Sequence, residues 1–210
     1  LVVNYKGINP IENYLISRRT MYWQVYLHKT VVGYEKMLVS LLNRAKCLTA
    51  KGCDVFAPPA LGYFLRNDVD AEWFAAYDEA FQMYLMLDDN DIMSAIKVWA
   101  MSDDKILSTL ATNILTRRLF KVEVFDEPVA QEYIDVIADS VAKKMGIPIE
   151  DTHYMVSVNA IQKDTYDISD NSITIVMKDG TTKDIAEASE ILNVQTLAKK
   201  NRKYFLCYQR

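Results

Sequence analysis

Residues 70–117 read DAEWFAAYDEAFQMYLMLDDNDIMSAIKVWAMSDDKILSTLATNILTR and contain neither glycine nor proline. Large apolar side chains recur there near helical spacing, at Trp73, Phe74, Tyr77, Phe81 and Tyr84. This pattern predicts a helix over 70–86. The acidic turn 88–91 then precedes a second helix over 92–101, and Ser102-Asp103-Asp104 caps a third over 105–117. No glycine occurs between Gly62 and Gly146, so this part of the chain is expected to be mostly helical.

The segment before this stretch also has a helical pattern. Asn9 is expected to cap a helix, with Pro10 in the first helical position and Glu12 as the capping-box carboxylate. That helix continues to about residue 51, with at most one break. The segment 55–65 contains Pro58-Pro59 and Gly62, and it is expected to be a loop.

The pattern changes after residue 119. Alternating apolar residues from Phe120 to Val124 predict a strand, and Pro128 opens a helix that Gly146 ends. Further strands are expected at 154–158 and 203–208, with a hairpin at 173–185 whose Asp179-Gly180 favours a type I′ turn. The predicted fold is mainly α, with a helical part at 1–116 followed by a small α+β part at 117–210.

Composition excludes several kinds of site. His28 and His153 are the only two histidines, so a HExxH motif or a three-histidine zinc site is impossible within the chain. Six scattered glycines form no Gly-rich phosphate loop. The acidic run at 88–91 lacks the later Gly and Glu of an EF-hand. We therefore predict no metal site and no catalytic residue in this chain.

Charge and cysteine content favour an intracellular protein. The net charge of −4 and the pI near 5.3 argue against nucleic-acid binding driven by overall charge. Cys47, Cys53 and Cys207 form no CxxC pair and fit reduced thiols. Cys47 and Cys53 are expected to pack as small apolar residues, and Met83 and Met86 are likewise expected in the core. No signal peptide and no apolar run of membrane-spanning length is present. We expect a cytoplasmic protein without membrane contact.

The segment 18–29, RRTMYWQVYLHK, carries the most informative side chains. On one continuous helix, Arg18, Tyr22, Tyr26 and Lys29 fall within about 80° of one another. Cations of this kind hold phosphate oxygens, and phenol rings offer flat surfaces and hydroxyls to a sugar or base. Spacing alone equally allows tyrosines in the core with cations at its edge.

Three stretches give the chain a family resemblance. ISRRTMYWQVYLHKTV at 16–31 resembles the helix that follows the metal-binding half of HD-domain phosphohydrolases of the deoxynucleoside triphosphate triphosphohydrolase-like group. YLMLDDNDIMSAIKVWAMSDDKIL and RRLFKVEVF resemble the acidic turn and the strand entry of that family, in the same order and spacing. The terminal KYFLCY is similar to bacterial members. The resemblance covers essentially the whole chain, as the C-terminal half of a longer protein.

The resemblance implies roles for seven residues. Arg18, Tyr22 and Tyr26 match substrate-pocket positions, although the vertebrate relative has His where this chain has Tyr22. His28 and Lys29 match a pair associated with a regulatory nucleotide site near a subunit interface, and Arg117 and Lys121 match regulatory phosphate contacts. From spacing alone, the last two residues could equally be solvated ends of a helix and a strand.

The resemblance also implies what lies outside the chain. The family holds a divalent metal with His, His-Asp and Asp ligands, and no His-Asp dipeptide occurs here. The metal-binding half is therefore expected upstream of Leu1, and the chain alone is expected to be inactive. Relatives of this kind imply a homo-oligomer and a deoxynucleoside triphosphate as substrate. The alternative from a different class is a non-catalytic regulatory or oligomerisation module that binds a nucleotide effector or a protein partner.

Overall fold

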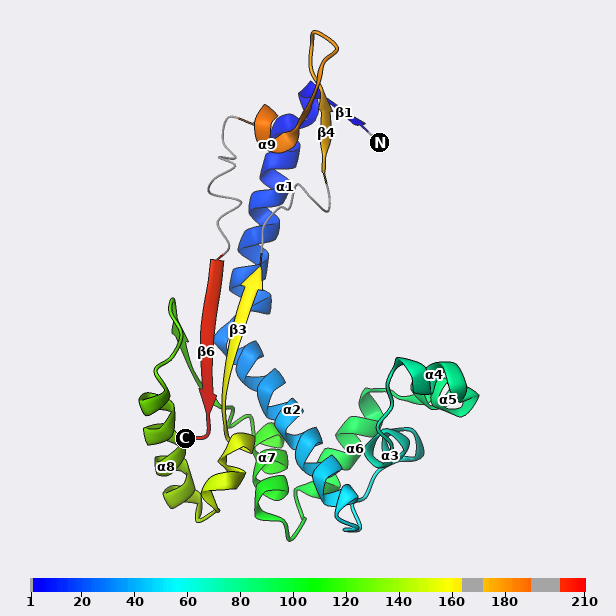
Figure 1. The fold of residues 1–210 in the computed structure, drawn as a ribbon, viewed down its shortest axis with the longest axis vertical. Helices are drawn as coiled ribbons and strands as arrows, with labels where there is room; N and C mark the ends of the chain where they lie inside the picture. Colours follow the sequence, from blue (N-terminus) through cyan, green and yellow to red (C-terminus); the bar gives the residue numbers. More distant parts are fainter. Residues whose placement is uncertain (1, 164–171, 190–200) are drawn as a thin grey trace. The chain divides into compact units, whose positions relative to one another are not determined.

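A computed structural model describes residues 2–163, 172–189 and 201–210, where the chain is mainly helical with a small β part, as predicted (Figure 1). The α-helices are α1 (Ile8–Met21), α2 (Lys29–Ala50), α3 (Pro59–Arg66), α4 (Ala71–Ala76), α5 (Asp78–Met86), α6 (Asp89–Trp99), α7 (Lys105–Leu115), α8 (Gln131–Met145) and α9 (Ile185–Ala188). The strands are β1 (Val2–Asn4), β2 (Lys121–Phe125), β3 (Val156–Lys163), β4 (Thr174–Val176), β5 (Thr182–Asp184) and β6 (Asn201–Tyr208). Every helix in these described ranges is too short or too polar to cross a lipid bilayer.

The chain forms two compact units that interleave along the sequence. The first comprises residues 1–32, 123–129 and 158–206, and the second comprises 33–122, 130–157 and 207–210. Strands β2, β6 and β3 pair in that order, and the division between the units falls within each of them. The sequence boundary expected between residues 116 and 117 stays a prediction.

In the first unit, a small sheet packs on the N-terminal part of α1. β1 pairs in parallel with β4, and β4 pairs antiparallel with β5. The side chains of Leu15, Ile175 and Ile185 form the buried centre of this unit. The predicted hairpin is confirmed but its turn type was wrong, because Gly180 alone has a positive φ of 81°. Its N–H donates to the carbonyl of Met177, which gives a three-residue loop ending in a left-handed glycine.

The start of α1 differs from the prediction. The helix begins at Ile8 after Gly7, so Asn9 lies inside it and is not its cap. Glu12 is buried and accepts a hydrogen bond from the hydroxyl of Ser189, so its carboxylate does not form a capping box. The predicted capping box would have joined Glu12 to a residue three positions away. Its partner in the structure lies 177 residues away along the chain.

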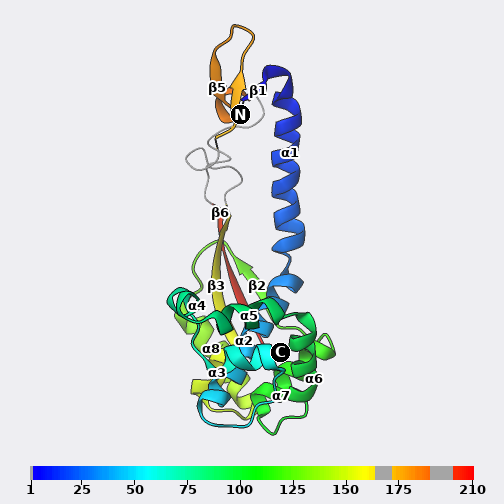
Figure 2. The same ribbon diagram turned by 90° about the vertical axis from the view of Figure 1, so that its right-hand side faces the viewer.

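The second unit contains the helices α2 to α8. The expected loop over 55–65 was wrong, because Pro59 opens α3 in the first-turn position that suits proline. The helix expected over 70–86 is divided at Tyr77 into α4 and α5. α6 packs against both α3 and α7 (Figure 2). The expected core position of Met86 was also wrong, since its side chain is exposed.

Side-chain caps fix the ends of these helices where the sequence predicted them. Asp88 and Asp91 form a capping box at the start of α6, and Asp104 accepts from the backbone N–H of Leu107 at the start of α7. Gly146 ends α8 in the left-handed conformation, with φ 58°.

Candidate functional site

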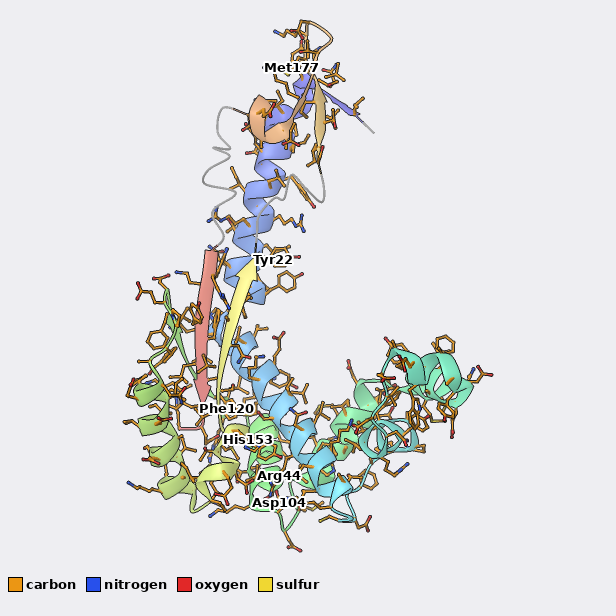
Figure 3. The ribbon with its side chains drawn as sticks, in the orientation of Figure 1. Tyr22, Arg44, Asp104, Phe120, His153 and Met177 are labelled. Carbon is orange, nitrogen blue, oxygen red and sulfur yellow. The ribbon has the colours of Figure 1, made fainter. Side chains whose placement is uncertain are left out.

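Arg18, Tyr22 and Tyr26 form a line of contacting side chains in the first unit. The Arg18 guanidinium carbon lies 5.7 Å from the centre of the Tyr22 ring, and the Tyr22 and Tyr26 rings lie 5.2 Å apart with a 39° tilt. Arg18 and Tyr26 are exposed, and Tyr22, labelled in Figure 3, is half-buried. The line therefore presents a cation and two aromatic rings together, as the helical spacing predicted.

The helix changes its winding beneath these tyrosines. Residues Tyr22–Tyr26 form a π-helical segment, in which the N–H of Leu27 donates to the carbonyl of Tyr22 at 2.8 Å. A π-helical turn is rare and is frequently found at functional sites. Lys29 lies beyond this segment as the first residue of α2, so the continuous helical spacing that grouped it with Arg18 does not hold.

His28 begins α2 as a capping residue. Its Nδ1 accepts the backbone N–H of Thr30 at 3.2 Å, and its carbonyl accepts the N–H of Val32 at 3.0 Å. Because Nδ1 is the acceptor, the neutral ring carries its proton on Nε2, where it can donate to another group. The side chains of His28 and Lys29 are both exposed.

Arg117 has an unusual backbone at the end of α7. Its φ is 57°, and among the described residues it is the one non-glycine residue with a positive φ. Its N–H donates to the carbonyl of Ile114, and the N–H of Arg118 donates to the carbonyl of Asn113 at 2.8 Å. These two bonds are those of a Schellman motif, in which this position is normally glycine. A side chain larger than glycine here costs about 1 kcal/mol of backbone strain, and such strain tends to occur at functional sites.

Lys121 lies at the start of β2, where its ammonium is 5.3 Å from the centre of the Tyr208 ring. Its strand packs closely against α2. A Cβ added at Gly33 would lie 3.2 Å from the carbonyl oxygen of Phe120 and 3.0 Å from the Val122 side chain. Gly33 therefore permits the close approach that places the start of β2 beside α2.

Sequence reasoning missed a buried ion cluster in the second unit. The Arg44 guanidinium donates to both carboxylate oxygens of Asp104, at 2.7 and 3.1 Å, and to Asp151 at 3.2 Å (Figure 3). It also lies 5.1 Å from the centre of the Tyr154 ring. A signal existed, because Arg44 follows Met37 and Leu41 on the buried face of α2. A cation at such a position on the buried side of a helix needs anionic partners.

The charged groups of this cluster stabilise the fold by pairing with one another. Burial raises the pKa of the Asp104 carboxyl, but the hydrogen bonds from Arg44 and from the backbone of Leu107 outweigh it and hold the pKa below its usual value of 3.8. The hydrogen bond to Asp104 raises the pKa of Arg44. Burial, followed by contact with Cys47, raises the pKa of Tyr154. Every charge of the cluster is thus paired within α2, α7 and the short helix Ile149–Tyr154.

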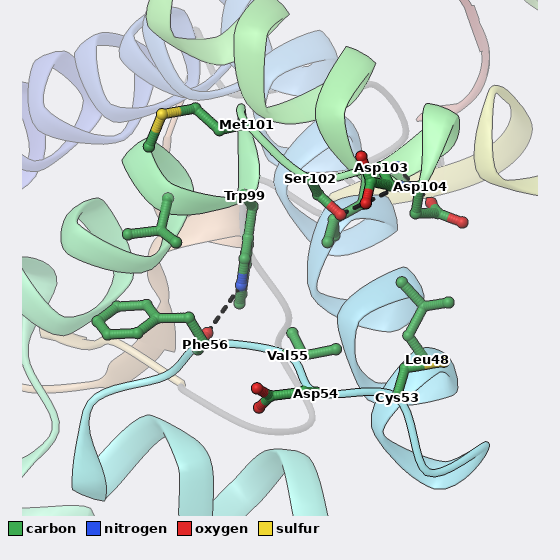
Figure 4. A pocket seen from close by; sticks show the side chains of 12 residues that line it. Leu48, Cys53, Asp54, Val55, Phe56, Trp99, Met101, Ser102, Asp103 and Asp104 are labelled. Carbon is green, nitrogen blue, oxygen red and sulfur yellow. Dashed lines mark hydrogen bonds between the residues drawn. The ribbon is translucent and has the colours of Figure 1, made fainter.

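A pocket of about 540 Å³ lies beside this cluster, between the end of α2, the segment 53–56, α6 and the start of α7 (Figure 4). The indole N–H of Trp99 donates to the carbonyl of Phe56 at 2.8 Å and fixes one wall. Three carboxylates, those of Asp54, Asp103 and Asp104, line it together with apolar side chains. Because it contains no lysine or arginine, this pocket does not suit a phosphate group.

Metal ligands and thiols are further reactive groups among the described residues. Within 2–163, 172–189 and 201–210, no group of three or more His, Cys, Asp or Glu residues is placed to hold a metal ion. Cys207 is buried, and burial raises the pKa of its thiol to about 11. Cys53 is exposed at the pocket, so the expectation that it packs as a small apolar residue was wrong.

Comparison with known proteins links the chain to a phosphohydrolase. Its structure matches that of a phosphohydrolase from Bacteroides thetaiotaomicron with a TM-score of 0.93 and 48% identity, over 100% of this chain and 52% of the other. Its sequence is 26% identical to the uncharacterized protein YwfO of Bacillus subtilis, over 96% of this chain and 45% of that protein. No family model matches. The chain thus spans about half the length of the relatives it matches.

Proposed function

We propose that this chain is the C-terminal portion of an HD-type phosphohydrolase that hydrolyses deoxynucleoside triphosphates in the intact protein. The observation that carries the proposal is the similarity to a phosphohydrolase along the whole chain, at 48% identity and a TM-score of 0.93. The three sequence stretches that resemble the deoxynucleoside triphosphate triphosphohydrolase-like group support the substrate class. A homo-oligomer in the cytoplasm is part of the same proposal.

In this proposal, Arg18, Tyr22 and Tyr26 position the nucleotide. The guanidinium of Arg18 binds phosphate oxygens, because it is planar, permanently charged and held beside the Tyr22 ring. The two tyrosines offer ring faces and hydroxyls to the base and sugar. The π-helical winding supports this role, because the two contacting rings lie at its ends and such turns are frequently found at functional sites.

The divalent metal of such an enzyme does not fit the residues of this chain. Two histidines lie 125 positions apart, and the described residues offer no cluster of ligands. We therefore assign no chemical step to this chain, and we place the metal in the part of the intact protein that the chain does not span. The role of the present residues is to bind and orient the nucleotide.

Replacing Arg18 by Ala in the intact protein tests this function. We expect kcat/KM for hydrolysis of the preferred deoxynucleoside triphosphate to fall about 10- to 100-fold, because a hydrogen bond to a charged group contributes about 1.5–3 kcal/mol. Phosphate and pyrophosphate release would be measured with the four deoxynucleotides and their ribonucleotide counterparts, in magnesium or manganese. Thermal unfolding would check that the variant folds.

Arg19→Ala is the matched control, because Arg19 neighbours Arg18 but lies off the line of Arg18, Tyr22 and Tyr26. It is expected to change kcat/KM less than threefold. Unchanged kinetics in Arg18→Ala would remove Arg18 from the substrate site. Lack of nucleotide hydrolysis by the folded intact protein would argue against the enzymatic function itself.

A second candidate function is favoured by the strained backbone of Arg117. In this alternative the chain is a regulatory or assembly module. His28 and Lys29 of the first unit, and Arg117 and Lys121 of the second, bind effector phosphates or a partner. Calorimetry of the chain with a nucleotide panel separates the two functions. Binding that survives Arg18→Ala but is lost in Lys121→Ala or Arg117→Ala, with Arg118→Ala as the control, would favour the second.

A further inference from the structure

Helix α5 carries a row of exposed apolar side chains. Phe81, Tyr84 and Leu85 are 51%, 58% and 63% exposed, and their spacing of three and four residues places them on one side of the helix. Tyr77, in the break between α4 and α5, is exposed as well. We call these four side chains the α5 face. A contiguous apolar patch of this kind marks an interaction surface, because leaving it in water is unfavourable.

Beside this face, α5 is held against the rest of the unit. Ala80 is fully buried, and α5 packs against α3 and α4. The ring of Tyr84 meets Phe74 edge to face, with 5.8 Å between the centres. The helix is therefore a fixed platform, and its exposed apolar side is not the result of a detached helix. A rigid apolar platform suits a partner that packs against it with matching shape.

The charge around the α5 face restricts what can cover it. Residues 67–96 contain eight Asp and Glu residues and no Lys, Arg or His. An anionic lipid surface or a nucleic acid would be repelled by this segment. Two copies of the α5 face packed symmetrically against each other would also bring like charges together. The fitting partner is an apolar protein surface with cations around its edge.

The relatives indicate where such a surface comes from. The chain matches them along 100% and 96% of its own length, yet it spans only 52% and 45% of theirs. We propose that the α5 face is the docking surface for the other half of the longer protein, whose contacting surface is apolar with a cationic rim. This inference rests on the part of the proposed function that makes the chain one portion of an intact protein, and it does not depend on the substrate.

Cysteine labelling tests the docking surface without any nucleotide. In a background in which Cys47, Cys53 and Cys207 are replaced by Ser, Leu85→Cys and Val136→Cys are labelled with a maleimide, in this chain alone and in the intact protein. Val136 lies on α8 and is 64% exposed, so it serves as the matched position outside the α5 face. Labelling at position 85 is expected to be at least tenfold slower in the intact protein, with less than a threefold change at position 136.

The outcomes separate the alternatives. Equal labelling of position 85 in both proteins, or equal slowing at both positions, would overturn the assignment. Slow labelling of position 85 in this chain alone, relieved by dilution, would identify a second copy as the occupant and also overturn it. Protection at position 85 in an intact protein that hydrolyses no nucleotide would keep this inference and refute the proposed substrate.

The predicted cationic rim of the partner surface is tested by placing opposite charges at position 85 of the α5 face. Leu85→Lys in the intact protein places a cation opposite the predicted cationic rim, and Leu85→Glu preserves the existing sign. Both variants remove the apolar contact, so the difference between them reports the charge of the partner. We expect urea unfolding to begin earlier in Leu85→Lys than in Leu85→Glu, and the reverse order would contradict a cationic rim.

Discussion

Arg44 holds Asp104 through two hydrogen bonds, at 2.7 and 3.1 Å, while Asp104 also accepts the backbone N–H of Leu107 at 2.8 Å. One carboxylate therefore joins α2 to α7 and caps α7. The bidentate geometry fixes the angle between the two helices more narrowly than a single contact would. Asp104 also lines the pocket of the second unit.

Asp104→Asn should separate the stabilisation due to the ion pair with Arg44 from that due to the cap of α7. Asparagine caps a helix as well as aspartate does, so the cap is retained while the ion pair is lost. We expect the free energy of unfolding to fall by about 2 kcal/mol, because Arg44 is left partly unpaired in a buried place. Urea unfolding measures this change, and Asp103→Asn, at the exposed neighbouring position, should change it by less than about 0.5 kcal/mol.

The pH dependence of the same pair has a definite sign. The pKa of Asp104 is lower in the folded chain than its usual value of 3.8, so the unfolded state binds more protons as the pH falls. The stabilisation is complete well above pH 4 and is lost as the pH falls below about 4. The free energy of unfolding should therefore decrease less steeply below pH 4 in Asp104→Asn than in the wild type. Equal slopes would contradict the assignment.

Arg117→Gly should stabilise the chain while removing a candidate phosphate contact. Glycine adopts φ 57° without the steric cost that Arg117 bears, so the free energy of unfolding should rise by about 1 kcal/mol. Arg118→Gly, one residue later and without a positive φ, should show no such gain. If effector binding weakens in a stabilised Arg117→Gly variant, the loss cannot come from unfolding. Destabilisation by Arg117→Gly would show that the side chain has a structural role.

Two glycines within helices should respond oppositely to alanine. Alanine stabilises a helix interior by about 1 kcal/mol relative to glycine. At Gly62, the nearest obstacle is the flexible end of Arg66 at 3.0 Å, so Gly62→Ala should gain most of that amount. At Gly33, the obstacle includes the carbonyl oxygen of Phe120 at 3.2 Å, which cannot move alone, so Gly33→Ala should lose about 1 kcal/mol. Thermal unfolding of the two variants tests this contrast.

Local signals in the sequence were sufficient for many helix ends. Asp70, Asp88 and Asp104 cap helices through N–H groups only two or three residues away, and Gly146 ends α8 through its own backbone. Contacts between distant residues were not predictable in the same way. The partners of Arg44 lie 60 and 107 residues further along the chain, and a single sequence does not say which carboxylates will meet a buried cation.

In the candidate site, too, the sequence predicted only contacts between residues close along one helix. The spacing of Arg18, Tyr22 and Tyr26 correctly predicted neighbouring side chains, because residues four apart are adjacent on a helix. The same spacing does not extend to Lys29, because the π-helical segment and the break before α2 interrupt the helix. Residues 22–28 contain no glycine or proline that would signal an interruption.

His28→Ala and His28→Asn should separate capping of α2 from ligand binding. Alanine removes the acceptor for the N–H of Thr30 and should cost about 1 kcal/mol of unfolding free energy, whereas asparagine supplies a new acceptor and should cost less than half of that. Neither variant retains the Nε2 donor. If His28 contacts an effector, both variants should weaken nucleotide binding in calorimetry, while only His28→Ala should unfold at clearly lower urea. Undiminished binding in both would leave His28 with the capping role alone.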